Sequence, residues 1–287
     1  MKKIGFIGVG IMGKSMVKNL MKNGFEVHIF ARNKSKVEDV INQGAIFHDS
    51  IKDCVKDCDA VLSIVGYPKD VEEIYLKEGN IFDSAKKGAF LIDMTTSSPS
   101  LAEKLYSKGK EVGFKVIDAP VTGGETGAKN GTLSILAGGE EKDFADCMEI
   151  FKAIGTNIRY QGKAGNGQHA KLANQIMIAG TMSGLCEALA YAKSKNLDLD
   201  TFIQSVATGA AGSRQLDSFA SKIIERDFTA SFYLKHFVKD MTLALEESKS
   251  SGLNLEILSD ALKNYTTLLE KGFGENGTQS LIAHYIP

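Results

Sequence analysis

The sequence predicts an α/β domain with a mostly parallel sheet, followed by an all-helical domain that is built on one long helix. Over residues 1–162, short apolar or β-branched runs alternate with amphipathic segments, and such alternation indicates a parallel sheet covered on both faces. A glycine-rich turn joins the first strand to the first helix. After Gly167, strand signals become few and the pattern is helical. We therefore predict two domains, residues 1–162 and residues 163–287.

The α/β half begins with a βαβ unit. The run Lys3–Val9 is a short apolar strand, and a glycine-punctuated turn leads from it into a helix, Gly13–Asn23. Gly24 ends that helix as a carboxyl cap, and Glu26–Phe30 then alternates as a second strand. The remaining predicted elements are a helix at Ser35–Asn42, strands at Ala45–Phe47, Ala60–Val65, Ala89–Met94, Lys115–Ile117, Leu133–Ala137 and Asn157–Tyr160, and a helix at Glu141–Ile154.

The carboxyl-terminal half is predicted to consist of helices. The first, residues 168–195, contains the longest apolar run, Ile176–Ala192. Because Thr181, Ser183 and Glu187 interrupt this run, it is typical of a core helix and not of a membrane span. Shorter helices are predicted at Asp200–Thr208, Ser213–Glu225, Phe237–Ser250 and Leu255–Lys271.

Composition excludes several classes of protein. The net charge of −1 provides no overall field that would attract nucleic acid or an anionic membrane. The amino-terminal MKKIGFIGVGIMG superficially resembles a signal peptide, but its regular glycines and lack of a cleavage site favour a buried strand. The four cysteines are scattered, which predicts reduced thiols, no metal site and a cytoplasmic protein.

The first turn carries the motif GxGxxG. Gly8, Gly10 and Gly13, with Ile11 and Met12 between them, lie between a strand and a helix at the start of the βαβ unit. In that setting the glycines allow a tight turn, approach of a pyrophosphate and close helix packing, and the helix amino terminus attracts the phosphates. We interpret the motif as a dinucleotide-binding turn; the alternative is a glycine-rich structural turn.

The end of the second strand indicates which dinucleotide is bound. An NAD site places an acidic residue here, but this chain has Ala31, Arg32 and Asn33, followed by Lys34. Since Arg32 can pair with a 2′-phosphate through two parallel bonds, NADP is favoured over NAD. The alternative is a solvated loop arginine.

The turns after Val9, Phe30, Val65, Met94 and Ile117 are expected to meet at the carboxyl edge of the sheet, where ligands of such sheets bind.

Two further segments carry residues suited to substrate chemistry. In DAPVTGG, the Thr122 hydroxyl and the N–H groups of Gly123 and Gly124 can bind a carboxylate, although a structural turn is the alternative. In GKAGNGQHAKLANQ, Lys171 and Asn174 share one helix face. Among small or apolar neighbours the charged form of a lysine is disfavoured, which suits it to general acid–base catalysis. The alternative is a solvated surface lysine.

Five segments taken together resemble a known family. In chain order GFIGVGIMGKSM, DMTTSSPS, DAPVTGG, GKAGNGQHAKLANQ and FYLKHFVKDMTLAL resemble the signature segments of the β-hydroxyacid dehydrogenases. The resemblance covers essentially the whole chain. It implies a Rossmann domain and an all-helical domain on a long interdomain helix. The apolar character of the helical half separately predicts a homodimer or homotetramer. The implied activity is NADP-dependent interconversion of a short β-hydroxy acid and its aldehyde or semialdehyde, as in 3-hydroxyisobutyrate dehydrogenase.

The resemblance also implies roles for individual residues. Lys171 matches the general acid/base, and Thr122, Gly123 and Gly124 match the site of the substrate carboxylate. The other matched positions are Thr95 beside the nicotinamide, Lys239 at the cofactor, and Phe232 and Asp240 lining the pocket.

The chain departs from the family pattern at two positions. Many members have the substrate-binding asparagine four residues after the lysine, where this chain has Gln175, so both Asn174 and Gln175 stay candidates, with Asn174 favoured. Where NAD-using relatives have Asp, this chain has Ala31. Two alternatives, imine reduction on the same scaffold and a non-catalytic binding module, are disfavoured because such relatives usually lack the lysine. The sequence does not fix the substrate.

Overall fold

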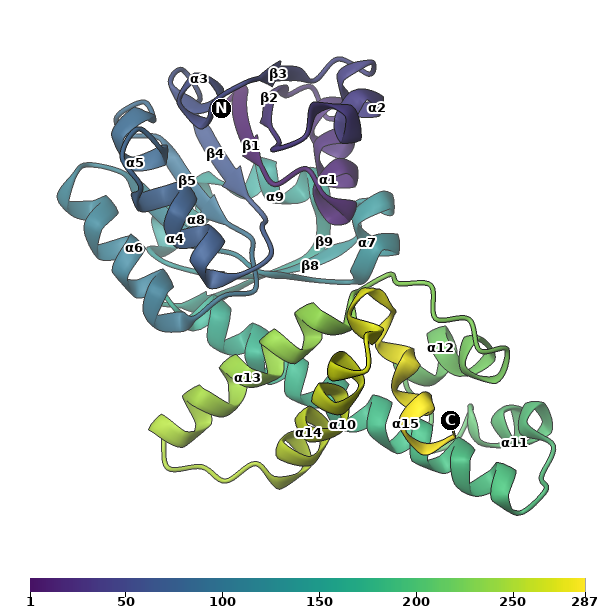
Figure 1. Ribbon diagram of the computed structural model, residues 1–287. Helices are drawn as coiled ribbons and strands as arrows, with labels where there is room; N and C mark the ends of the chain where they lie inside the picture. The colour runs from purple at the N-terminus through teal and green to yellow at the C-terminus, as the bar shows by residue number, and fades with distance from the viewer. Residues whose placement is uncertain (287) are drawn as a thin grey trace. The chain divides into compact units, whose positions relative to one another are not determined.

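A nine-stranded sheet forms the centre of the amino-terminal unit of the protein, Met1–Lys171 (Figure 1). The structure is a computed structural model, and it describes residues 1–286. The strand order is β3-β2-β1-β4-β5-β6-β8-β7, and β9 pairs with β8. The strands are β1 (Lys3–Ile7), β2 (Glu26–Phe30), β3 (Ile46–His48), β4 (Ala60–Ser63), β5 (Phe90–Asp93), β6 (Lys115–Asp118), β7 (Val121–Thr122), β8 (Leu133–Gly138) and β9 (Gly155–Gly162).

The pairing is mostly parallel. Neighbouring strands from β3 to β6 are all parallel, so their carboxyl ends lie at one edge of the sheet, as predicted. β8 runs antiparallel to β6 and β7 and parallel to β9. The turns that follow β1, β2, β4, β5 and β6 therefore converge at the same edge.

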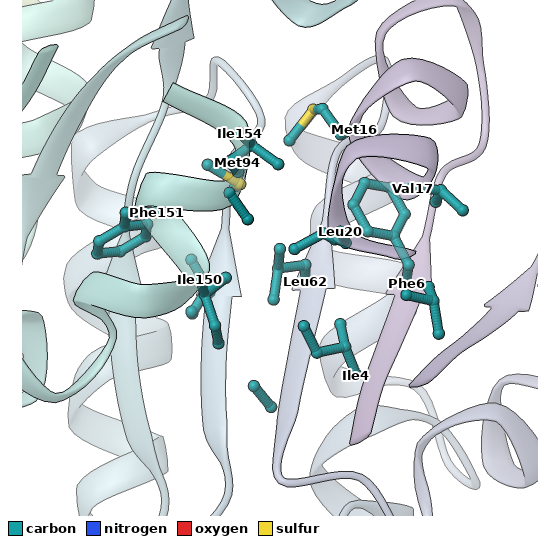
Figure 2. Close-up of a cluster of buried hydrophobic side chains, with 14 of the residues drawn as sticks. Ile4, Phe6, Met16, Val17, Leu20, Leu62, Met94, Ile150, Phe151 and Ile154 are labelled. Atoms are coloured by element: carbon teal, nitrogen blue, oxygen red, sulfur yellow. The ribbon is translucent and has the colours of Figure 1, made fainter. Parts of the chain in front are cut away.

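Helices cover both faces of the sheet. Packed on one face are α1 (Ile11–Lys22), α7 (Gly124–Asn130) and α9 (Met148–Ile154) together with the short η1 (Lys34–Val37) and α2 (Glu38–Ile41). Figure 2 shows side chains of α1 and α9 pointing toward those of the sheet, with labels on Ile4, Phe6, Met16, Val17, Leu20, Leu62, Met94, Ile150, Phe151 and Ile154. The opposite face is covered by α3 (Ile51–Val55), α4 (Pro68–Leu76), α5 (Ile81–Ser84) and α6 (Pro99–Glu111).

Two helical predictions in this unit need correction. The segment Glu141–Ile154 is not one helix but two, α8 (Glu141–Asp146) and α9, with Cys147 between them outside helical geometry. The helix α7 is absent from the predicted elements, because its sequence, GETGAKN, is rich in glycine. Gly127 is instead a packing residue, since a Cβ on it would lie 3.2 Å from the Leu133 side chain of β8.

The second unit, which begins at Leu172, is helical over the described residues. Its first element is α10 (Asn166–Ser194), a continuous 29-residue helix that begins in the first unit. The others are α11 (Leu199–Val206), α12 (Arg214–Ile224), α13 (Leu234–Ser250), α14 (Glu256–Glu270), η2 (Phe273–Glu275), η3 (Thr278–Leu281) and α15 (Ile282–Tyr285). The predicted fold class, a mostly parallel α/β sheet followed by an all-helical domain that starts with a long helix, is confirmed.

The carboxyl-terminal segment is fastened to the start of α13. The Leu234 N–H donates to Asn276 O at 2.8 Å, Gly277 N–H donates to Phe228 O at 2.8 Å, and Tyr265 donates from its hydroxyl to Thr278 O. Among residues 1–286, none of the helices combines the length and hydropathy that a membrane crossing requires. The predicted domain boundary at Gly162 stays a prediction.

Candidate active site

The three motif glycines have different surroundings. A Cβ on Gly8 would lie 2.0 Å from Ile64 O, and a Cβ on Gly13 would lie 2.1 Å from Gly8 O, so packing of the protein itself requires both glycines. A Cβ on Gly10 would meet nothing within 4 Å. Gly10 therefore leaves open space at the amino terminus of α1, where backbone N–H groups and the helix dipole favour an anion. The turn fits a dinucleotide pyrophosphate.

The loop after β2 carries positive charge and no acid. Between Phe30 and Val37 the chain has one arginine, two lysines and no Asp or Glu, and Arg32 is exposed. Asn33 shapes the loop, because its side-chain oxygen accepts hydrogen bonds from the Ser35 N–H at 3.0 Å and from the Ser35 hydroxyl at 2.7 Å.

Hydrogen bonds tie the loops after β4 and β5 together. Thr95 is buried, and its hydroxyl oxygen accepts the Val65 N–H at 3.0 Å. Asp93, at the end of β5, accepts the Ser63 hydroxyl at 2.8 Å and the Thr95 N–H at 3.2 Å. Val65 and Thr95, both predicted at the cofactor, are thus neighbours at the carboxyl edge of the sheet.

The segment after β6 contains the residues that were predicted to bind a carboxylate. Thr122 is the last residue of β7 and is half-buried. Gly123 and Gly124 are exposed and have φ values of +131° and +63°, which glycine adopts at little cost. They lead into α7, so this backbone turn opens at the surface of the first unit.

The start of α10 is held at the same edge of the sheet. Asp118, the last residue of β6, accepts the Gly165 N–H at 2.8 Å through Oδ1 and the Gln168 N–H at 2.9 Å through Oδ2. Burial raises the pKa of Asp118 to about 7, against the lowering effect of these two N–H donors. Lys171 follows one turn later and is only 7% exposed, so it is not a solvated surface residue.

Gln168 joins this helix start to the loop after β5. Its side-chain oxygen accepts the Ser97 N–H at 2.8 Å, and its side-chain nitrogen donates to Thr95 O at 2.8 Å. Sequence reasoning did not assign a role to Gln168 or to the Asp118 carboxylate. The available signal was a glutamine three residues before Lys171 on the same helix face.

In the second unit, four of the remaining predicted residues form a chain of polar contacts. The Asn174 side-chain nitrogen donates to Gln175 Oε1 at 2.8 Å, and Gln175 Nε2 donates to Asp240 Oδ2 at 2.7 Å. The Lys239 ammonium lies 2.8 Å from Asp240 Oδ1. Gln175 and Asp240 are each 1% exposed, whereas Asn174 is half-buried. Phe232 packs edge-on against Phe237, with ring centroids 6.0 Å apart.

Thiols and metal ligands add no further site. Cys54, Cys58, Cys147 and Cys186 are all free and buried. Within residues 1–286, no group of three or more His, Cys, Asp or Glu side chains is placed to hold a metal ion.

Comparison with known proteins finds matches over nearly the whole chain. Residues 3–162 match the NAD-binding domain of 6-phosphogluconate dehydrogenase, and residues 165–285 match the NAD-binding domain of NADP-dependent 3-hydroxyisobutyrate dehydrogenase. A probable 3-hydroxyisobutyrate dehydrogenase-like protein of Arabidopsis thaliana is 44% identical over 98% of this chain and 84% of its own length. The chain belongs to the β-hydroxyacid dehydrogenase family. As a β-hydroxyacid dehydrogenase family member it is an NAD(P)-dependent oxidoreductase.

Two other comparisons give a similar oxidoreductase and a similar fold. An uncharacterized oxidoreductase of Bacillus subtilis, YkwC, is 48% identical over 98% of this chain and 97% of its own length. The crystal structure of a 3-hydroxyisobutyrate dehydrogenase from Salmonella typhimurium has a TM-score of 0.91 over 99% of both chains at 22% identity. At that identity, the likeness shows the β-hydroxyacid dehydrogenase fold alone.

Proposed function

We propose that this protein is an NADP-dependent dehydrogenase that interconverts a short β-hydroxy acid and its aldehyde or semialdehyde, with Lys171 as the general acid/base. The observation that carries the proposal is the burial of Lys171 one turn after the anchored start of α10. A lysine in that setting differs from the solvated lysines on most helices. Because Lys171 is present, imine reduction and a non-catalytic binding role stay disfavoured.

The proposed chemistry needs one proton transfer by the protein. When bound, the nicotinamide cofactor supplies or accepts the hydride. In the reducing direction the Lys171 ammonium protonates the oxygen of the reacting carbonyl, and in the oxidising direction the Lys171 amine takes the hydroxyl proton. Positioned proton transfer of this kind contributes about 10²–10⁴-fold to a rate.

The substrate carboxylate is proposed to bind at the corner formed by Thr122, Gly123 and Gly124. The two exposed glycines with positive φ support this role, since such turns present backbone N–H groups to anions. Of the two amides on α10, we assign the substrate contact to Asn174. Both ends of the Gln175 side chain are already engaged, by Asn174 and Asp240, so Gln175 orients Asn174.

The cofactor is proposed to be NADP in preference to NAD. Gly8, Gly10, Ile11, Met12 and Gly13 would hold its pyrophosphate. Arg32, with Ala31 and Asn33 beside it, would receive the 2′-phosphate, and the absence of an acidic residue in residues 31–36 supports this assignment. Val65, Thr95 and Lys239 would contact the nicotinamide half, while Phe232 and Asp240 would line the substrate pocket.

We further propose that the protein forms a homo-oligomer in the cytoplasm. Met177 and Tyr191 lie on one face of α10 and are 72% and 65% exposed, and Ile257 at the start of α14 is 72% exposed. Large apolar side chains that are exposed on a helix face support association. The buried free cysteines support a reducing compartment.

An assay of the purified protein with both cofactors tests the proposal. A panel of short-chain semialdehydes, β-hydroxy acids and cyclic imines is incubated separately with NADPH or NADP and with NADH or NAD. The expected result is turnover of at least one semialdehyde and its β-hydroxy acid, with higher kcat/KM for the phosphorylated cofactor. Turnover of imines alone, or cofactor binding without turnover of any compound, would contradict the proposal.

A further inference from the structure

The first turn of α10 is fastened to the sheet by side chains as well as by its backbone. The Asp118 carboxylate receives the N–H groups of Gly165 and Gln168, so it caps the helix from the end of β6. The Gln168 side chain then spans to the loop after β5, where it meets both a backbone donor, Ser97 N–H, and a backbone acceptor, Thr95 O. Gln168 is fully buried.

Close backbone contact fixes the same turn. A Cβ on Gly167 would lie 2.4 Å from Leu136 O, 2.5 Å from Asp118 O and 2.7 Å from Asp118 Oδ2. A Cβ on Gly138 would lie 2.7 Å from Asp118 Oδ1 and 2.8 Å from Gly167 N. Because most of these neighbours are backbone atoms, the helix start cannot shift toward the sheet, and the hydrogen bonds prevent it from moving away.

We propose that Gln168 and Asp118 are positioning residues for the reaction, and that they act by fixing the location of Lys171 relative to the Thr95 loop. This inference rests on the proposed role of Lys171. Gln168 and Lys171 are three residues apart on one helix face, so a rotation or translation of the first turn moves the amine directly. The Gln168 amide makes the Thr95 loop and the lysine-bearing turn one rigid unit.

The size of the expected effect follows from the sensitivity of catalysis to geometry. A misplacement of about 1 Å can cost about 100-fold in rate. Gln168→Met keeps the length of the side chain and removes both hydrogen bonds, so kcat per active site should fall at least about tenfold. NADP affinity should stay within about twofold, because the phosphate-binding turn belongs to β1 and α1.

Gln168→Glu provides a conservative rescue. A protonated glutamic acid offers one O–H donor and one acceptor, as glutamine does, whereas the ionised carboxylate cannot donate to Thr95 O. The ratio of its kcat to that of the wild-type protein should therefore fall as pH rises. The corresponding ratio for Gln168→Met should not change with pH. His169→Gln, an exposed neighbour on the same turn, is the matched control and should leave kcat unchanged.

A double-mutant cycle with Lys171→Ala separates positioning from a merely structural role. The substrate is the semialdehyde with the highest turnover in the panel, and active sites are counted by cofactor titration. If Gln168 acts through Lys171, the loss caused by Gln168→Met disappears in the Lys171→Ala background. Hydrogen exchange in the cofactor-free protein should also become faster at residues 168–172 in Gln168→Met and not in His169→Gln.

The outcomes distinguish this inference from the proposed function. Two results would overturn the inference while Lys171→Ala is nearly inactive. In the first, Gln168→Met keeps a normal kcat per active site. In the second, Gln168→Met lowers kcat by the same factor in the wild-type protein and in Lys171→Ala. Near-normal turnover of Lys171→Ala would instead overturn the proposed function and this inference with it.

Discussion

At the scale of single residues, the structure separates three glycines that the motif treats alike. Gly8 and Gly13 are required because backbone atoms lie where a Cβ would go, whereas Gly10 faces open space. The sequence predicted all three from spacing alone. It could not predict which of them serve packing and which leaves room for a ligand, because that depends on the folded positions of Ile64, just after β4, and of Phe6 in β1.

We predict that Gly10→Ala and Gly13→Ala have opposite signatures. Gly10 has φ −86°, which alanine adopts readily, so Gly10→Ala should leave the free energy of unfolding unchanged or raise it by about 0.4–1 kcal/mol. NADP affinity should fall at least about tenfold, or about 1.4 kcal/mol, because the new methyl group occupies the pyrophosphate space. Gly13→Ala should lower the free energy of unfolding by about 1–3 kcal/mol through overpacking.

Chemical denaturation of the cofactor-free protein and calorimetric titration with NADP measure these two quantities. A Gly10→Ala protein that binds NADP normally would show that the open space is not the pyrophosphate site.

Arg32 is the residue that decides between the two cofactors. Loss of a hydrogen bond to a charged group costs about 1.5–3 kcal/mol, so Arg32→Ala should weaken NADP binding about 10–100-fold. NAD lacks the 2′-phosphate, and its affinity should change by less than about twofold. Lys22→Ala, which removes an exposed positive charge at the far end of α1, controls for long-range electrostatics. Equal losses for NADP and NAD, measured by fluorescence titration, would rule out Arg32 as the 2′-phosphate ligand.

At the scale of elements, periodicity and capping predicted most of the helices and strands. β2 lies at Glu26–Phe30 as predicted, because it alternates cleanly and Gly24 ends the helix before it. α7 was missed because glycine weakens helical propensity, and the role of Gly127 is explained only by its packing against Leu133. The break at Cys147 has no proline or glycine to announce it in the sequence.

The cap of α10 should make stability depend on pH. The pKa of Asp118 is raised from 3.8 to about 7 in the folded protein, so between these values the folded state binds more protons than the unfolded state. The contribution of Asp118 is therefore fully present below about pH 4 and is lost as pH rises through about 7. Its slope approaches at most about −1.4 kcal/mol per pH unit.

Urea unfolding of the wild-type and Asp118→Asn proteins from pH 4 to pH 8 measures this contribution as the difference between two curves. The wild-type free energy of unfolding should decline more steeply than that of Asp118→Asn across pH 4–7. Parallel curves would mean that Asp118 titrates near its ordinary pKa.

At the scale of the whole molecule, the sequence identified the family and the class of each half but not the network that organises the site. Five ordered segments matched the family over the full chain, and the comparisons agree. Gln168 escaped notice because its partners, Thr95 and Ser97, are more than seventy residues away in the sequence. The pairing of Gln175 with Asp240 likewise joins positions 65 residues apart. The local sequence does not identify the partners in contacts of this kind.

Self-association is also a property of the whole molecule. If the exposed face of α10 mediates it, Met177→Asp combined with Tyr191→Asp should shift the protein to a monomer, because a charge on an apolar interface is costly to bury. Light scattering coupled to size exclusion measures the mass. Lys193→Asp is the control, because it adds negative charge near the end of the helix, and it should leave the mass unchanged. Ala173→Asp is not suitable as a control, because Ala173 lies on the same face as Met177 and Tyr191. An unchanged mass for the double variant would remove this face from the interface.

The most direct test of the central claim is the single-turnover rate of Lys171→Ala with NADPH and the preferred semialdehyde. We predict a fall of about 10²–10⁴-fold or more in that rate, with NADPH affinity nearly unchanged and Lys163→Ala, an exposed lysine just before α10, indistinguishable from wild type. A Lys171→Ala protein that reduces the semialdehyde at nearly the wild-type rate would show that this lysine does not transfer the proton.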